Sequence, residues 1–120
     1  IPSIIWNRVE NLSLLGMPDL LGYNKKQCFF TVELKVVKGN KIKFSPHQIA
    51  WHKTHPQNTF IMAKTLDPCT LKTSSISLFR GSSIMALARY GMKVDACACG
   101  FPACASMFDE VGLTLENFGA

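Results

Sequence analysis

The 120-residue sequence lacks any apolar run that approaches the roughly 18 to 20 residues needed for a membrane-spanning helix. Its N-terminal segment also lacks the order of basic, apolar and small residues that is typical of a secretory signal peptide. From these two absences we expect a protein of the cytoplasm that has no membrane partner.

Acidic residues are few, because 8 Asp and Glu stand against 13 Lys and Arg, which gives a formal net charge of +5. A positive surface favours anionic partners, and nucleic acid is the commonest of them. The length and the 48% hydrophobic content allow one domain with a real core. No internal repeat or low-complexity linker divides the chain, so we expect a single domain over residues 1–120.

The cysteines do not form an even set, because there are five of them, and an odd number fits reduced thiols better than a closed disulfide framework. Cys97, Cys99 and Cys104 follow a C-x-C-x4-C spacing with no histidine nearby, whereas structural zinc sites usually contain a C-x-x-C pair and a second pair of ligands. We therefore predict buried thiols in an alanine-rich segment, and structural zinc is the alternative.

The hydrophobic pattern is mixed. It predicts, in chain order, a helix over residues 1–16, strands over 18–23 and 27–37 joined by a polar turn, a helix over 45–55, a strand over 59–66 and a helix over 76–92. The helix over 45–55 has the clearest signals, with Ser45 as N-cap, Pro46 in the first turn, Gln48 three residues after the cap, and Pro56 beyond its end. The last thirty residues have no clear pattern. The expected fold is a small α/β domain with a mixed central β-sheet flanked by helices.

The strand over 27–37 contains one acid, Glu33, among apolar neighbours. Side chains alternate along a strand, so Glu33 and Lys35 share a face, and Asp19 at the start of the preceding strand can converge on the same place. Two carboxylates and a lysine at one sheet edge suit phosphodiester hydrolysis. The carboxylates would hold Mg²⁺ or Mn²⁺, and the ammonium group would stabilise developing negative charge.

The order of these residues resembles a known family. Asp19 in "GMPD", Glu33 and Lys35 in "VELK", and Gln48 in "SPHQIAWH" resemble the motifs of the PD-(D/E)XK nuclease superfamily, most closely its VRR-NUC branch, which is similar to Holliday junction resolvases. The resemblance covers about residues 10–64, roughly half of the chain. It implies a restriction-endonuclease-like core in a single nuclease domain, with the C-terminal third unassigned.

The resemblance also implies roles for individual residues. Asp19 and Glu33 would be the metal-binding carboxylates, with the backbone carbonyl of Leu34 as a further ligand. Lys35 would be the catalytic lysine, and Gln48 the glutamine that family members carry near the active site on the helix after the E-x-K strand.

Glu10, in "NRVENL", lies where such nucleases often have a helical acid that completes the metal shell. Each of these residues also has a structural interpretation. Glu10 would be a solvated helix residue, Asp19 would open a turn, and Gln48 would belong to the capping box of Ser45. Glu33 and Lys35 would form an ion pair on an exposed sheet.

Basic residues crowd the turns on either side of the E-x-K strand. If they form a track for phosphate groups, they would contact nucleic acid. If they are an ordinary run of charged residues, they would be solvated surface. The predicted contacts are Lys25, Lys26, Lys38, Lys41, Lys43, His47 and His52.

The leading hypothesis is a Mg²⁺- or Mn²⁺-dependent endonuclease that hydrolyses DNA, with structured or branched DNA favoured. The resolvase-like resemblance implies a homodimer, and a phage origin, in the cytoplasm of a host cell, would suit a minimal nuclease. The first alternative is a non-catalytic basic module that binds nucleic acid. The second is a zinc-binding adaptor centred on Cys97, Cys99 and Cys104.

Overall fold

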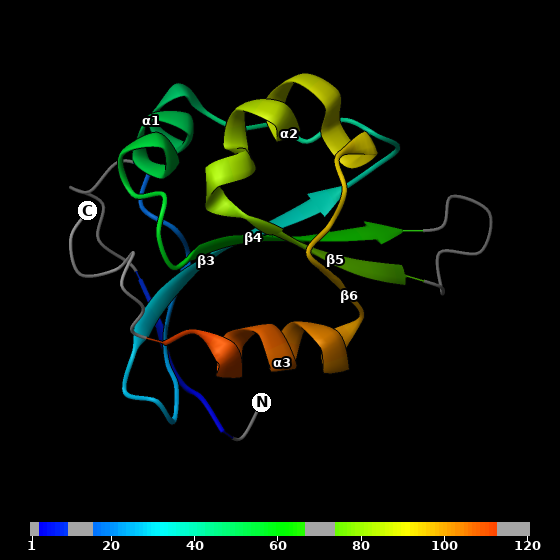
Figure 1. Ribbon diagram of the computed structural model, residues 1–120. Coiled ribbons are helices and arrows are strands. Elements are labelled where there is room, and N and C mark those ends of the chain that lie inside the picture. The colour runs from blue at the N-terminus through cyan, green and yellow to red at the C-terminus, as the bar shows by residue number, and fades with distance from the viewer. Residues whose placement is uncertain (1–2, 10–15, 67–73, 113–120) are drawn as a thin grey trace.

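The computed structural model describes residues 3–9, 16–66 and 74–112, and it is a six-stranded mixed sheet with helices on both faces (Figure 1). The strands follow one another in chain order across the sheet, and neighbours are antiparallel except for β3 and β4, which are parallel. Their bounds are β1 (Ile5–Arg8), β2 (Leu20–Tyr23), β3 (Phe29–Val37), β4 (Thr59–Leu66), β5 (Ser74–Arg80) and β6 (Ala98–Cys99).

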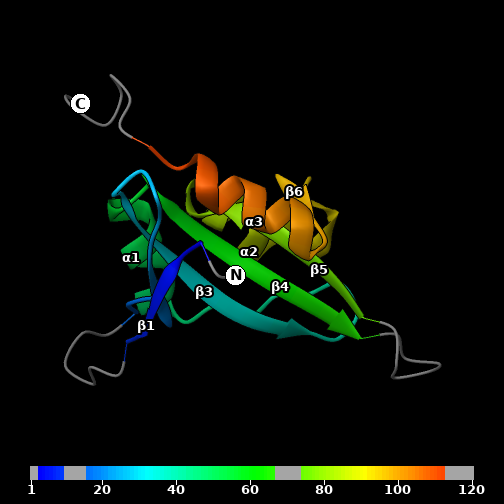
Figure 2. The ribbon, with the colours of Figure 1, turned by 90° about the horizontal axis from the view of Figure 1, so that it is seen from below.

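Two helices cover one face of the sheet and a third covers the other (Figures 1 and 2). α1 (Pro46–Thr54) makes the crossover between the parallel strands and lies beside α2 (Ile84–Tyr90), while α3 (Phe101–Glu110) packs on the opposite face. Single 3₁₀ turns, η1 (Gly81–Ser83) and η2 (Gly91–Lys93), flank α2. The expected α/β fold with a mixed sheet flanked by helices is therefore confirmed. Within the described ranges, no helix is long and apolar enough to cross a membrane.

Each face of the sheet has its own hydrophobic core. Under α3, the ring of Phe108 stacks on that of Phe30 with centroids 4.9 Å apart, and Trp6 meets both rings edge-on at 5.5 Å. Under α1 and α2, Val37, Ile61 and other apolar side chains form the second core. Central strands buried on both faces are apolar at successive positions, which is why "TFIMAKTL" is recognisable as a strand.

The prediction of a first helix over residues 1–16 is wrong where the structure describes this segment. Ile5–Arg8 forms the edge strand β1, which pairs with β2. Ile4 and Trp6 both pack on the core under α3, two residues apart as in a strand, and this tertiary contact outweighs the helical spacing. Residues 10–15 lie outside the described residues.

The prediction of a helix over 76–92 is right only in its second half. Residues up to Arg80 belong to β5, where Phe79 faces one core and Leu78 the other, and α2 begins only at Ile84. The unpatterned C-terminal segment contains η2, β6 and α3. By contrast, α1 has the predicted capping box, in which Ser45 accepts from the Gln48 backbone N–H and the Gln48 side chain accepts from the Ser45 N–H.

Gly81 lies where β5 meets η1, and it has no room for a side chain. A Cβ there would lie 1.9 Å from Thr59 Oγ1 and 2.9 Å from His52 Nδ1. Gly81→Ala should therefore lower the free energy of unfolding by about 1–3 kcal/mol, as overpacking does, in urea denaturation. Gly112→Ala is the control, because its Cβ would meet the flexible side chain of Lys26 at 3.3 Å and the Glu110 carbonyl oxygen at an ordinary contact distance of 3.7 Å. Equal stability of the two variants would contradict this packing.

Candidate active site

The β2–β3 hairpin brings the two predicted carboxylates together. Leu20 pairs with Val32, and the same register continued by one residue places Asp19 opposite Glu33. Asp19 Oδ2 accepts a hydrogen bond from the backbone N–H of Leu34, 2.9 Å away. Asp19 is therefore fixed to β3 itself, and it does more than open a turn.

The segment before Asp19 is held against the start of α1. Gly16 has a φ of +82°, and a Cβ at this position would lie 2.2 Å from the carbonyl oxygen of His47. Pro18 is buried. The close approach that only glycine permits here lets the chain pass against the start of α1 just before it enters β2, and so helps to position Asp19.

Glu33 is a buried acid, with 3% of its surface exposed. Its Oε2 atom is buried without a hydrogen-bond partner among the described residues. Burial, and then the neighbouring Asp19 carboxylate, raise the pKa of Glu33 to about 8, and the Lys35 ammonium group opposes this shift only in part. An ion pair on an exposed sheet therefore does not describe Glu33.

Gln48 connects the acid to the lysine from the first turn of α1. Its Nε2 donates to Glu33 Oε1 at 3.0 Å, and its Oε1 accepts from Lys35 Nζ, also at 3.0 Å. The backbone N–H of Ser45 donates to the same Oε1. A flipped amide would set its NH₂ group against two donors, so the network fixes its orientation. The capping role and the site role of Gln48 thus coexist.

Lys35 is half-buried and shares the face of Glu33, as strand alternation predicts. Its Nζ also lies 5.0 Å from the centroid of the Phe44 ring, a favourable cation–π distance. Two contacts, one to the amide of Gln48 and one to this ring, therefore hold the ammonium group beside the carboxylates.

The donors fit a magnesium-like cation better than a zinc-like one. No cluster of three or more His, Cys, Asp or Glu side chains that could hold a metal occurs in the part of the chain described. Mg²⁺, however, is commonly bound by one or two carboxylates, with water and substrate phosphate completing the shell. The N–H and C=O of one strand residue point to the same edge, so the Leu34 carbonyl faces the side on which Asp19 lies. The two carboxylates and this carbonyl are the groups that could contribute to such a shell.

Two predicted site residues are not brought into this arrangement. Glu10 lies outside the described residues. His52 is fully buried in α1, and both of its ring nitrogens lack a partner among the described residues. Burial, followed by the nearby His55 and Lys35, lowers the pKa of His52 to about 4, so the ring is neutral near pH 7. The prediction that His52 contacts nucleic acid is therefore wrong, because its side chain packs in the interior, whereas His47 is exposed.

The predicted basic residues lie at two ends of β3. Lys25 and Lys26 belong to the β2–β3 turn, and Lys38, Lys41 and Lys43 lie in the loop that follows the C-terminal end of β3. There the loop packs on the end of α2, because Asn40 donates to the Tyr90 carbonyl and accepts from the Met92 N–H. This contact brings the exposed Lys93 of η2 to the loop. The sequence alone did not predict this neighbour, because no local pattern links Lys93 to the loop. The resulting basic cluster consists of Lys38, Lys41, Lys43 and Lys93.

The cysteines of the C-terminal segment lie around β6 and the start of α3. Cys104 is buried, and burial raises the pKa of both Cys97 and Cys104. All four described cysteines are free thiols, and Cys69 lies outside the described residues. The predicted buried thiol is therefore found at Cys104, while Cys99 is exposed.

Comparison of the chain with protein-family models, with curated proteins and with solved structures finds no match.

Proposed function

We propose that the protein is a divalent-metal-dependent nuclease that hydrolyses phosphodiester bonds of DNA at the site formed by Asp19, Glu33, Lys35 and Gln48. The observation that carries this proposal is the buried Glu33 carboxylate, whose Oε2 lacks a partner while Asp19 lies opposite. Burying a carboxylate beside another is costly for folding alone. A site that receives a cation explains the arrangement.

Each residue has a defined task in this proposal. Asp19 and Glu33, with the Leu34 carbonyl, would hold Mg²⁺ or Mn²⁺, which when bound polarises the phosphate and acidifies water. Lys35 would place its ammonium group against the charge that develops on the phosphate oxygens. Gln48 would orient Glu33 and Lys35 together through its two 3.0 Å hydrogen bonds.

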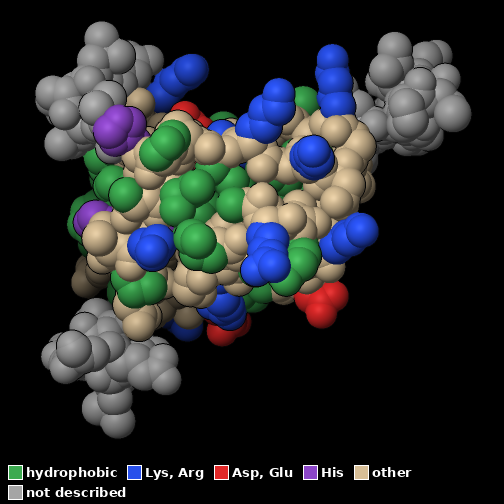
Figure 3. All heavy atoms as spheres, turned by 90° about the horizontal axis from the view of Figure 1, so that it is seen from above, with side chains coloured by type: hydrophobic (Ala, Val, Ile, Leu, Met, Phe, Trp, Pro, Cys, Tyr) green, Lys and Arg blue, Asp and Glu red, His purple; other side chains and the backbone are tan. Residues whose placement is uncertain are grey.

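The surface around α1 and α2 suits a polyanion. Figure 3 shows lysine and arginine side chains spread over this face, with few acids among them. Lys38, Lys41, Lys43 and Lys93 would contact phosphates without reading sequence. We propose structured or branched DNA as the substrate, and a symmetric homodimer would present two such sites to two strands.

The test is a cleavage assay on labelled single-stranded, duplex, flap and four-way-junction DNA in Mg²⁺, Mn²⁺ or EDTA. Glu33→Gln keeps the size of the side chain and removes the carboxylate, so products should form with the wild type in metal and disappear in the variant. Asp95→Asn, at an exposed loop position, is the matched control and should cut normally.

The outcomes separate the two main hypotheses. Loss of cleavage in EDTA and in Glu33→Gln, but not in Asp95→Asn, would support the nuclease. Salt-sensitive DNA binding without cleavage of any substrate would instead favour the non-catalytic binding module.

A further inference from the structure

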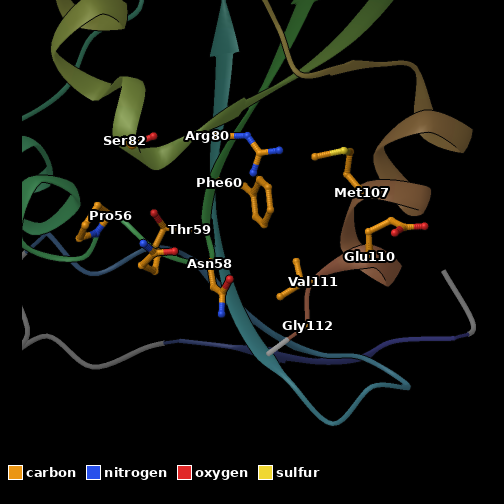
Figure 4. A pocket seen from close by; sticks show the side chains of 11 residues that line it. Pro56, Asn58, Thr59, Phe60, Arg80, Ser82, Met107, Glu110, Val111 and Gly112 are labelled. Atoms are coloured by element: carbon orange, nitrogen blue, oxygen red, sulfur yellow. The ribbon is translucent and has the colours of Figure 1, made fainter. Parts of the chain in front are cut away.

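A pocket of about 500 Å³ lies between the sheet and the C-terminal end of α3 (Figure 4). Its volume falls within the range of small-molecule sites. The start of β4 and the end of β5 form one wall, and α3 forms the other (Figure 4). None of the four proposed active-site residues lines it, so it is a separate feature of the molecule.

The pocket joins a cation to an apolar surface. Arg80 is an exposed residue at the end of β5, where it pairs with Phe60 of β4, and its positive charge partly opposes the rise that burial causes in the pKa of Cys97. Its guanidinium group extends into the pocket beside Phe60 and faces Met107 (Figure 4). Glu110 is the acid in the lining, and its carboxylate points away from Arg80 in the same view. An anionic group can therefore approach Arg80 without facing this carboxylate.

The remaining lining supplies polar groups at the rim. Asn58 and Gln57 carry amides that can pair with the edge of a nucleic-acid base, and Ser82 adds a hydroxyl group. The partly exposed Met107, with the buried Phe60 and Val111 beneath it, gives an apolar wall on which the body of a base can rest. A cation, apolar walls and amides in one pocket of this size fit a nucleotide.

The pocket and the proposed active site lie near one another along the strands but on opposite faces of the sheet, because Phe60 packs under α3 whereas Ile61, which pairs with Glu33, packs under α1 and α2. Thr59, in its lining, pairs with Thr31, and the Thr31 N–H donates to the Asn58 carbonyl at 3.0 Å. Thr31 precedes Glu33 by two residues, which is roughly 7 Å along a strand. A single strand that reached both the catalytic residues and the pocket would therefore have to pass around the end of the sheet.

We propose that this pocket binds one nucleotide of a single-stranded segment, with its phosphate at Arg80 and its base against Met107 and Val111. The inference rests on the proposed function for the identity of the ligand, and it assigns the substrate a single-stranded part that is held outside the catalytic site. Binding of a free mononucleotide tests the pocket without any cleavage.

The experiment is a titration of the ¹⁵N-labelled full chain with dAMP in EDTA, followed by amide chemical shifts. Shifts should gather at Asn58, Phe60, Arg80 and Val111. Arg80→Gln should weaken dAMP binding at least about tenfold, because it removes a charged donor to the phosphate. Arg89→Gln is the matched control, since Arg89 is an exposed arginine of α2 outside the pocket, and should bind as the wild type does.

Inorganic phosphate and Met107→Ala test the role of the base. Phosphate alone should bind more weakly than dAMP, and Met107→Ala should reduce that difference; thermal unfolding verifies that each variant is folded. Equal affinity of Arg80→Gln and Arg89→Gln, shifts spread over the surface lysines, or phosphate binding as tight as that of dAMP would each overturn the proposal. A chain that binds dAMP here but cuts no DNA would overturn the nuclease and keep the pocket.

Discussion

Lys35→Met should reduce the single-turnover cleavage rate about 10²- to 10³-fold, while binding of uncut DNA changes by no more than a fewfold. The magnitude is that expected when one donor to a developing oxyanion is removed. Methionine keeps the length and much of the apolar contact of the lysine stem, so packing near Phe44 should survive. The measurement is the rate at saturating protein in Mg²⁺, beside a binding isotherm on the same DNA in Ca²⁺ or EDTA.

Lys64→Met is the control for this variant. Lys64 is an exposed strand lysine of β4, and it belongs to the opposite face of the sheet, because Lys35 pairs with Ala63 and Val36 with Lys64. It should cut at the wild-type rate. A similar loss in both variants would mean that general charge, rather than the position of Lys35 beside Gln48, governs cleavage.

Glu33 should make the stability of the metal-free protein fall as the pH rises from about 5 to 8.5. Its pKa is raised from 4.5 to about 8 in the folded chain, so above the unfolded value the folded state holds a proton that the unfolded state has lost. The contribution of Glu33 to the free energy of unfolding is therefore fully present below pH 4.5 and is lost as the pH rises towards 8. The effect is on the order of a few kcal/mol. It is measured by urea denaturation at several pH values in EDTA.

Glu33→Gln removes this titration, so its stability should depend less on pH and should exceed that of the wild type at pH 8.5. Mg²⁺ should raise the Tm of the wild type at this pH by binding the ionised carboxylates of the folded state. The variant should gain much less. Parallel pH profiles for the two proteins, or equal gains from Mg²⁺, would show that Glu33 neither titrates in this range nor holds the ion.

The parts of the candidate site that could be predicted from the sequence are those set by local rules. Strand alternation places Glu33 and Lys35 on one face, a short hairpin brings Asp19 opposite, and the capping box fixes the first turn of α1 with Gln48 in it. Each of these relations joins residues within 15 positions of one another. Three strands of the sheet, β2, β3 and β4, follow from the same kind of pattern.

The parts that could not be predicted depend on contacts between distant segments. Ile4 and Trp6 pack as strand residues only because α3, which lies near the other end of the described chain, covers them. The pocket needs Arg80 from β5 and Met107 from α3, which no sequence pattern connects. His52 resembles a surface histidine in sequence and is buried because Gly81, with no side chain, lets the chain pass next to its ring.

The hydrogen bonds between the β2–β3 hairpin and the C-terminal end of α3 determine when the hairpin can be anchored during synthesis of the chain on the ribosome. The Asn24 side chain donates to the carbonyls of Phe108 and Val111, 84 and 87 positions later, and Phe108 completes the aromatic stack on Phe30. Until those late residues emerge, one face of the nascent sheet stays open to water and the hairpin that carries the acids is unanchored. We expect the geometry of the proposed active site to form only when translation has passed Val111, so that, if the protein is the proposed nuclease, no earlier fragment of this domain should cut nucleic acid.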